Sequence, residues 1–65
     1  MDKSRFTKRY EHFRELLVQA RKNAGLKQRE VAEILDEPQS FVSRYETGER
    51  RLDLVEFLEV AEALQ

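Results

Sequence analysis

A row of polar side chains in residues 39–47 is suited to reading DNA bases. In a helix, residues three and four apart share a face, and the outer face of this segment would carry Gln39, Ser40, Ser43 and Arg44. A glutamine amide can pair with adenine, an arginine can donate twice to guanine, and a serine hydroxyl can bond to a base or a phosphate. This pattern favours a helix that enters the major groove of DNA.

A second short helix is predicted just before this segment. Val31, Ala32 and Leu35 share one face of residues 28–35, and Asp36-Glu37-Pro38 then interrupts the helical pattern, because the residue before proline is pushed out of the α region. Two short helices joined by a break of three or four residues, the second with a polar outer face, are typical of a helix-turn-helix.

Two further helices must hold this pair in place. In residues 7–24 an apolar stripe is formed by Phe13, Leu16, Leu17, Ala20 and Ala24, at spacings of three and four. Residues 54–64 follow a capping-box pattern, in which Asp53 is the N-cap and Glu56 is the third helical residue. The buried face of that helix is expected to consist of Leu54, Phe57, Leu58, Ala61 and Leu64. The sequence predicts an all-α fold, a compact bundle of four helices at about 7–24, 28–35, 39–47 and 54–64, within a single domain of residues 1–65.

Composition excludes several other classes of protein. The 65 residues include no cysteine and one histidine, so a disulfide and a Cys/His zinc site are excluded. The longest apolar run, Leu16–Val18, is too short for a membrane span. The net charge is −1, but the nine basic and three acidic side chains of residues 1–29 sum to +6, whereas residues 30–65 sum to −7. The domain is therefore strongly dipolar, and a local basic face would matter for binding a polyanion, although charge alone is as expected for a soluble helical surface.

A longer motif resembles a known family. The run Gly25-Leu26-Lys27-Gln28-Arg29-Glu30-Val31-Ala32, followed by Gln39-Ser40-Phe41-Val42-Ser43-Arg44-Tyr45-Glu46-Thr47-Gly48-Glu49-Arg50, is similar to the Xre family of phage-repressor/Cro-type helix-turn-helix domains. The resemblance implies a lambda-repressor-like fold of about five helices, the last of which is either missing or lies beyond residue 65. It also implies a cytoplasmic, prokaryotic or phage-like repressor that acts as a homodimer on palindromic operator DNA.

The resemblance assigns roles to individual residues. Bases would be read by Gln39, Ser40, Phe41, Ser43 and Arg44. The DNA backbone would be bound by Lys27, Gln28, Arg29, Thr47, Arg50 and Arg51. Gln28 would also brace Gln39, and an ion pair between Arg21 and Glu46 would fix the recognition helix to the rest of the domain. No metal or cofactor is expected.

The sequence departs from the family pattern at three informative positions. Lys27 replaces the usual Ser or Thr cap, which weakens the start of the second helix. Asp36 stands where the family has a turn glycine, and a left-handed conformation costs more at Asp than at Gly. Phe41 replaces a small polar residue, so its ring would either contact a thymine methyl group or cover the junction between the two short helices.

One other function is compatible with parts of the sequence. The acidic last helix would face away from DNA, and its exposed end would suit a protein-interaction module of the antitoxin or coactivator type. An enzyme is not expected, because the carboxylates show no pattern that indicates a pocket.

Overall fold

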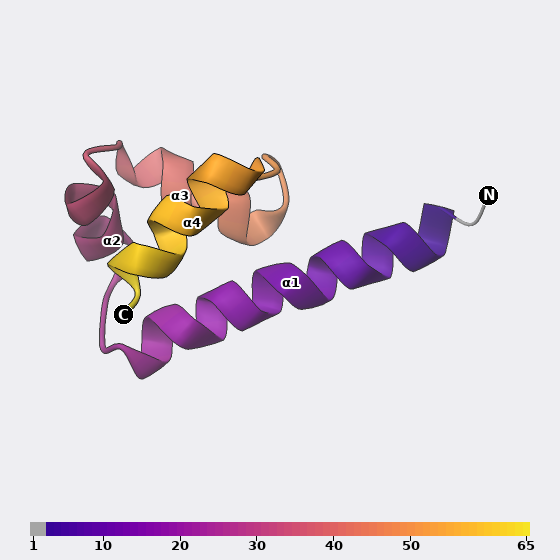
Figure 1. The fold of residues 1–65 in the computed structure, drawn as a ribbon, viewed down its shortest axis with the longest axis horizontal. Coiled ribbons are helices and arrows are strands. Elements are labelled where there is room, and N and C mark those ends of the chain that lie inside the picture. Colours follow the sequence, from indigo (N-terminus) through magenta and orange to yellow (C-terminus); the bar gives the residue numbers. More distant parts are fainter. Residues whose placement is uncertain (1–2) are drawn as a thin grey trace.

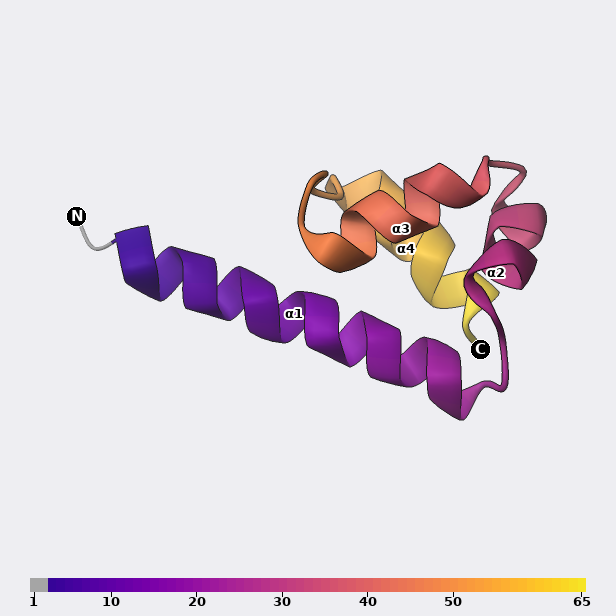
Figure 2. The same ribbon diagram turned by 180° about the vertical axis from the view of Figure 1, so that it is seen from behind.

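The part of the chain that the structure describes forms four α-helices. The computed structural model describes the backbone of residues 3–65 and the side chains of residues 8–65. The helices are α1 (Lys3–Asn23), α2 (Gln28–Leu35), α3 (Gln39–Thr47) and α4 (Leu54–Ala63). The three short helices gather beside the C-terminal half of α1, whose N-terminal half extends beyond them (Figures 1 and 2). The all-α prediction is confirmed.

Helix α1 is longer than the sequence pattern indicated. It begins at Lys3 rather than near residue 7, because no glycine or proline interrupts residues 3–23. It ends just before Gly25, which adopts the left-handed conformation with φ of 75°. The Leu26 N–H then donates to the Arg21 carbonyl at 3.1 Å, so the chain turns sharply towards α2.

The turn between α2 and α3 has the left-handed conformation for which a turn glycine is usual, although Asp36 occupies this position. Asp36 is left-handed, with φ of 58° and ψ of 44°. The Glu37 N–H donates to the Ala32 carbonyl at 3.0 Å, which satisfies an acceptor at the end of α2. Pro38 occupies the N-cap of α3. Both helices span the predicted ranges, because proline and a left-handed residue define their limits.

Helix α4 starts as predicted but buries a different stripe. The Asp53 carboxylate accepts from the Glu56 N–H at 2.8 Å, and the Glu56 carboxylate accepts from the Asp53 N–H at 3.0 Å. The prediction that Leu54 and Leu58 are buried was wrong: they are 73% and 53% exposed, whereas Val60 is fully buried. α4 contacts α2, and this contact turns Val60 inwards. The helix ends at Ala63, one residue before the expected limit.

The core joins residues from all four helices. Its buried apolar members are Leu17, Val31, Ala32, Val42, Tyr45 and Val60. Phe13 and Phe57 extend it between α1 and α4, with ring centroids 5.4 Å apart. Leu16, which was expected in the same stripe, is 56% exposed. Within the described residues, no helix is long and apolar enough to cross a membrane.

Tyr45 places a hydroxyl in this core. The side chain is 1% exposed, and its oxygen has no hydrogen-bond partner among the described residues. The pKa of Tyr45 is raised to about 12, mainly by burial and to a smaller extent by the neighbouring Glu46 carboxylate, while Arg21 opposes the shift. The folded protein therefore holds the phenol proton more tightly than the unfolded chain does.

Because the buried phenol holds its proton more tightly than the unfolded chain does, we expect the folded protein to lose stability at alkaline pH. The contribution of Tyr45 is fully present below pH 10, the ordinary tyrosine pKa, and is lost as the pH rises from 10 to about 12. The loss amounts to about 2 to 3 kcal/mol. Urea unfolding of the wild type and Tyr45→Phe at pH 8 to 11.5 should show a steeper decline for the wild type. Equal declines would contradict the prediction.

Candidate nucleic-acid interface

The outer face of α3 presents the predicted base-reading residues together. Gln39, Ser40 and Arg44 are exposed, and Ser43 is half-buried beside them. Val42 and Tyr45, on the opposite face of the helix, are buried in the core. The helix is therefore fixed from behind while its amide, hydroxyl and guanidinium groups face outwards, an arrangement that suits base edges in a major groove.

Two glutamines connect this face to the inside of the domain. The Gln39 amide donates to the Gln28 carbonyl oxygen at 3.5 Å, the limit of a hydrogen bond. Gln28 in turn donates through its own amide to Glu46 Oε1 at 2.7 Å. Because the Gln28 amide nitrogen donates to Glu46, the Gln28 carbonyl oxygen is the end that accepts from Gln39. Gln39 is thereby oriented through a chain of two hydrogen bonds.

Glu46 is the centre of this network. It is a buried carboxylate, 8% exposed, and Arg21 donates to both of its oxygens, at 2.7 and 3.2 Å. Arg21 also donates to the Leu26 carbonyl at 3.0 Å. The pair therefore joins α1, the loop after it and the last turn of α3. Its charges are compensated internally, so the pair fixes α3 to α1.

The start of α2 forms a basic hollow next to Gln39. The hollow has a volume of about 360 Å³ and is lined by Arg21, Lys27, Gln28, Arg29 and Gln39. The Lys27 N–H donates to the Glu30 carboxylate at 2.7 Å, but a lysine side chain cannot return the bond because it has no acceptor. The cap is thus incomplete, and the N-terminal amides of α2 favour an anion.

Phe41 packs against its own domain. Its ring lies 5.6 Å from the Tyr45 ring at an interplanar angle of 73°, and the guanidinium carbon of Arg50 lies 4.9 Å from its centroid. The half-buried ring therefore covers the edge of the core. Contact of this ring with a thymine methyl group stays a prediction.

Three residues at and after the end of α3, which were expected to bind the DNA backbone, contact other groups of the protein. Arg50 forms an ion pair with Glu56 at 2.6 Å, and this hydrogen-bonded pair lowers the pKa of Glu56 and raises that of Arg50. Arg51 lies over the Tyr10 ring, 4.3 Å from its centroid. The exposed Thr47 hydroxyl donates to the Arg44 carbonyl at 3.2 Å. These three residues lie apart from the basic hollow of α2.

Sequence reasoning missed two residues of α1 that support this region. Arg14 donates to the Glu46 carbonyl at 2.9 Å, and its side chain lies against Gly48, where a methyl group would approach it to 2.9 Å. The Tyr10 hydroxyl accepts from the Leu52 N–H at 3.1 Å. A signal for Arg14 existed: it precedes Arg21 by seven residues and so shares its helix face.

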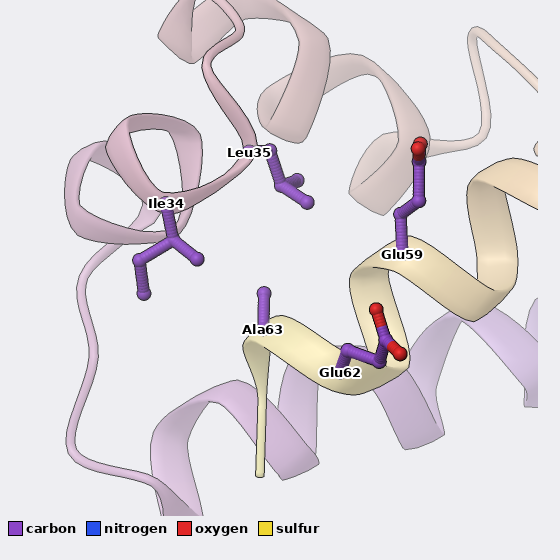
Figure 3. A pocket seen from close by; sticks show the side chains of 5 residues that line it. All are labelled: Ile34, Leu35, Glu59, Glu62 and Ala63. Carbon is purple, nitrogen blue, oxygen red and sulfur yellow. The ribbon is translucent and has the colours of Figure 1, made fainter.

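A hollow on another part of the surface has the opposite electrostatic character. Ile34 and Leu35 of α2 lie across from Ala63 of α4, and Glu59 and Glu62 line the α4 side (Figure 3). Two carboxylates beside apolar side chains repel phosphate. This contrast favours the α2–α3 surface as the nucleic-acid interface.

Comparison with known proteins agrees with this architecture. The family model described as Helix-turn-helix (HTH_3) matches residues 17–65. The solved structure of an XRE-family like protein from Pseudomonas syringae pv. tomato str. DC3000 has a TM-score of 0.92 and 44% sequence identity, over 95% of this chain and 76% of that chain. No curated protein matches the sequence. The lambda-repressor-like fold is confirmed, and the chain belongs to the Xre/Cro-type family of helix-turn-helix DNA-binding domains.

Proposed function

We propose that this protein is a sequence-specific transcriptional repressor that inserts α3 into the major groove of double-stranded DNA. The observation that carries the proposal is the exposed row of Gln39, Ser40 and Arg44, with Gln39 linked through Gln28 to buried Glu46. A side chain that is oriented before binding loses less conformational entropy when it contacts a base, and Gln39 is oriented in this way. The protein would act on DNA in the cytoplasm, without catalytic activity.

Each side chain has a proposed role in the complex. Bases are read by Gln39, Ser40, Ser43 and Arg44. Phosphates are bound at the start of α2, by Lys27, Gln28 and Arg29, and after α3, by Thr47, Arg50 and Arg51. Phosphate contacts fix the register of the protein on the duplex, whereas base contacts determine the sequence.

The proposed active form is a homodimer on a palindromic operator. An apolar groove of about 370 Å³ lies between α1 and α4 and is lined by Phe13, Leu16, Leu17, Ala20, Phe57, Ala61 and Leu64. Leu54 and Leu58 are exposed on the same helix. A second copy would bury this surface and place two recognition helices on successive major grooves.

A selection from random duplexes tests the proposal. The expected result is an enriched palindrome with half-sites about one helical turn, 10 to 10.5 base pairs, apart. The protein should bind this site at least about a thousandfold more tightly than scrambled DNA. Sedimentation should give a dimer on the selected site. Reduced transcription from a promoter that overlaps the site would show that the protein represses rather than activates. No enrichment at low salt would reject sequence-specific binding.

A protein-interaction module on the same scaffold is the second candidate. The acid-edged hollow of α2 and α4 favours it, since Ile34 and Ala63 offer an apolar contact beside two carboxylates. This candidate predicts weak DNA binding without sequence preference and a stable complex with a basic protein partner. The duplex selection separates the two candidates directly.

A further inference from the structure

The guanidinium group of Arg50 is occupied by a carboxylate of its own chain. Nη1 donates to Glu56 Oε1 at 2.9 Å, and Nη2 donates to Glu56 Oε2 at 2.6 Å. Nη1 also donates to the Arg51 carbonyl at 3.3 Å. A two-pronged pair of this kind uses the same donors with which an arginine binds phosphate. Arg50 is therefore both neutralised and blocked along one edge.

The position of this pair is fixed from both sides. Phe41 of α3 supports the guanidinium group, whose carbon lies 4.9 Å from the ring centroid. Glu56 is held by the capping box at the start of α4, where its Oε1 also accepts from the Asp53 N–H at 3.0 Å. The pair thus connects the segment after α3 to the first turn of α4. It forms part of the wall of a hollow lined by Glu37, Pro38, Ser40, Phe41, Arg44, Arg50 and Glu56.

This hollow lies beside the base-reading row, since Ser40 and Arg44 line it. A DNA strand that contacts α3 would pass close to Arg50. The carboxylates of Asp53 and Glu37 add to the negative potential at this arginine. A phosphate that approaches Arg50 would meet a neutral pair flanked by further negative charge.

We propose that Glu56 restrains Arg50 and thereby weakens the sequence-independent part of DNA binding. A phosphate binds Arg50 only after it has displaced the Glu56 carboxylate, so Arg50 contributes little on arbitrary DNA. A larger share of the affinity then comes from base contacts made by Gln39 and Arg44. This inference rests on the proposed function, because it assigns Glu56 a role in limiting phosphate binding at the same DNA-binding surface.

Glu56→Gln is the variant that releases Arg50 and keeps the helix start, since glutamine also serves as the third residue of a capping box. Its matched control is Glu59→Gln, which changes the net charge equally on the same helix. Glu56→Ala provides a second release of Arg50, and the double variants R50A/E56Q and R50A/E59Q are compared with R50A. Thermal melts monitored by circular dichroism establish that each variant is folded.

Binding of a labelled random-sequence duplex is measured by fluorescence anisotropy between 50 and 200 mM salt. We expect E56Q to bind more tightly than E59Q at 50 mM and to show a salt slope steeper by about 0.9, which corresponds to one added phosphate contact. Over this range E56Q should lose about three times more affinity than E59Q. Adding E56Q to R50A should strengthen binding only as much as adding E59Q does.

The possible failures are distinguishable. If the wild type binds the duplex while E56Q and E59Q behave alike, or E56Q binds more weakly than E59Q, the restraint by Glu56 is overturned and the proposed function stands. If the wild type binds no duplex at 50 mM, the proposed function and this inference both fail. A gain by E56Q that persists in full when Arg50 is absent also overturns the inference, because the effect would then be long-range repulsion alone.

Discussion

Replacing Glu46 with alanine is expected to lower the free energy of unfolding by about 3 to 5 kcal/mol. The carboxylate is 8% exposed and accepts hydrogen bonds from Arg21 and Gln28. Its removal leaves the Arg21 guanidinium, 13% exposed, without its counter-charge. A domain of this size rarely has more than about 3 to 5 kcal/mol of stability in total, so E46A should be largely unfolded at room temperature.

Far-UV circular dichroism with urea titration measures this effect. E46A should lose most of its helical signal without denaturant, whereas Glu49→Ala, at an exposed position three residues later, should change stability by no more than about 0.5 kcal/mol. A cost of E46A below about 1 kcal/mol would show that the pair acts as an ordinary surface ion pair.

A paired replacement separates stability from positioning. R21M/E46L exchanges the ion pair for apolar side chains, a change that is often neutral or stabilising when both charges are removed together. The folded double variant would still lack the acceptor for Gln28 and therefore the support of Gln39. We expect it to retain binding to random DNA and to discriminate less well between the selected and scrambled sites.

The helix-turn-helix was predictable because individual residues mark the ends of its two helices. Pro38 cannot continue the preceding helix, and Asp36 and Gly48 tolerate the left-handed conformation that ends α2 and α3, with φ of 58° and 91°. The apolar residues between these signals have a clear helical spacing. The N-terminal limit of α1 was not predictable in this way, because residues 3–7 contain neither a breaker nor part of the stripe that indicated the helix.

The buried stripe of α4 illustrates what local pattern cannot decide. Apolar residues surround most of this helix, so several stripes are equally compatible with its sequence. The contact with α2 selects Val60 and leaves Leu54 and Leu58 exposed. The partner of Arg50 escaped prediction for a similar reason: Glu56 had a sufficient local role in the capping box, and its second bond depends on the path of residues 48–53.

Changing Gln39 and Arg44 together to alanine is expected to weaken binding to the selected operator by about 2 to 6 kcal/mol, since a good two-pronged base contact is worth about 1 to 3 kcal/mol. Both side chains are exposed, so the fold should remain intact. On scrambled DNA, Gln39 contributes nothing specific and Arg44 only its charge. Q39A/R44A should therefore lose most of the preference for the selected site.

The matched control is K27A/R29A, at the basic start of α2. Phosphate contacts do not depend on sequence, so this variant should weaken binding to the selected and scrambled duplexes alike and reduce the salt slope by about 2. Titrations of both duplexes at two salt concentrations distinguish the variants. If Q39A/R44A weakens both duplexes equally, these residues bind the backbone and α3 does not read bases through them. If K27A/R29A instead removes the sequence preference, the start of α2 is the element that determines specificity.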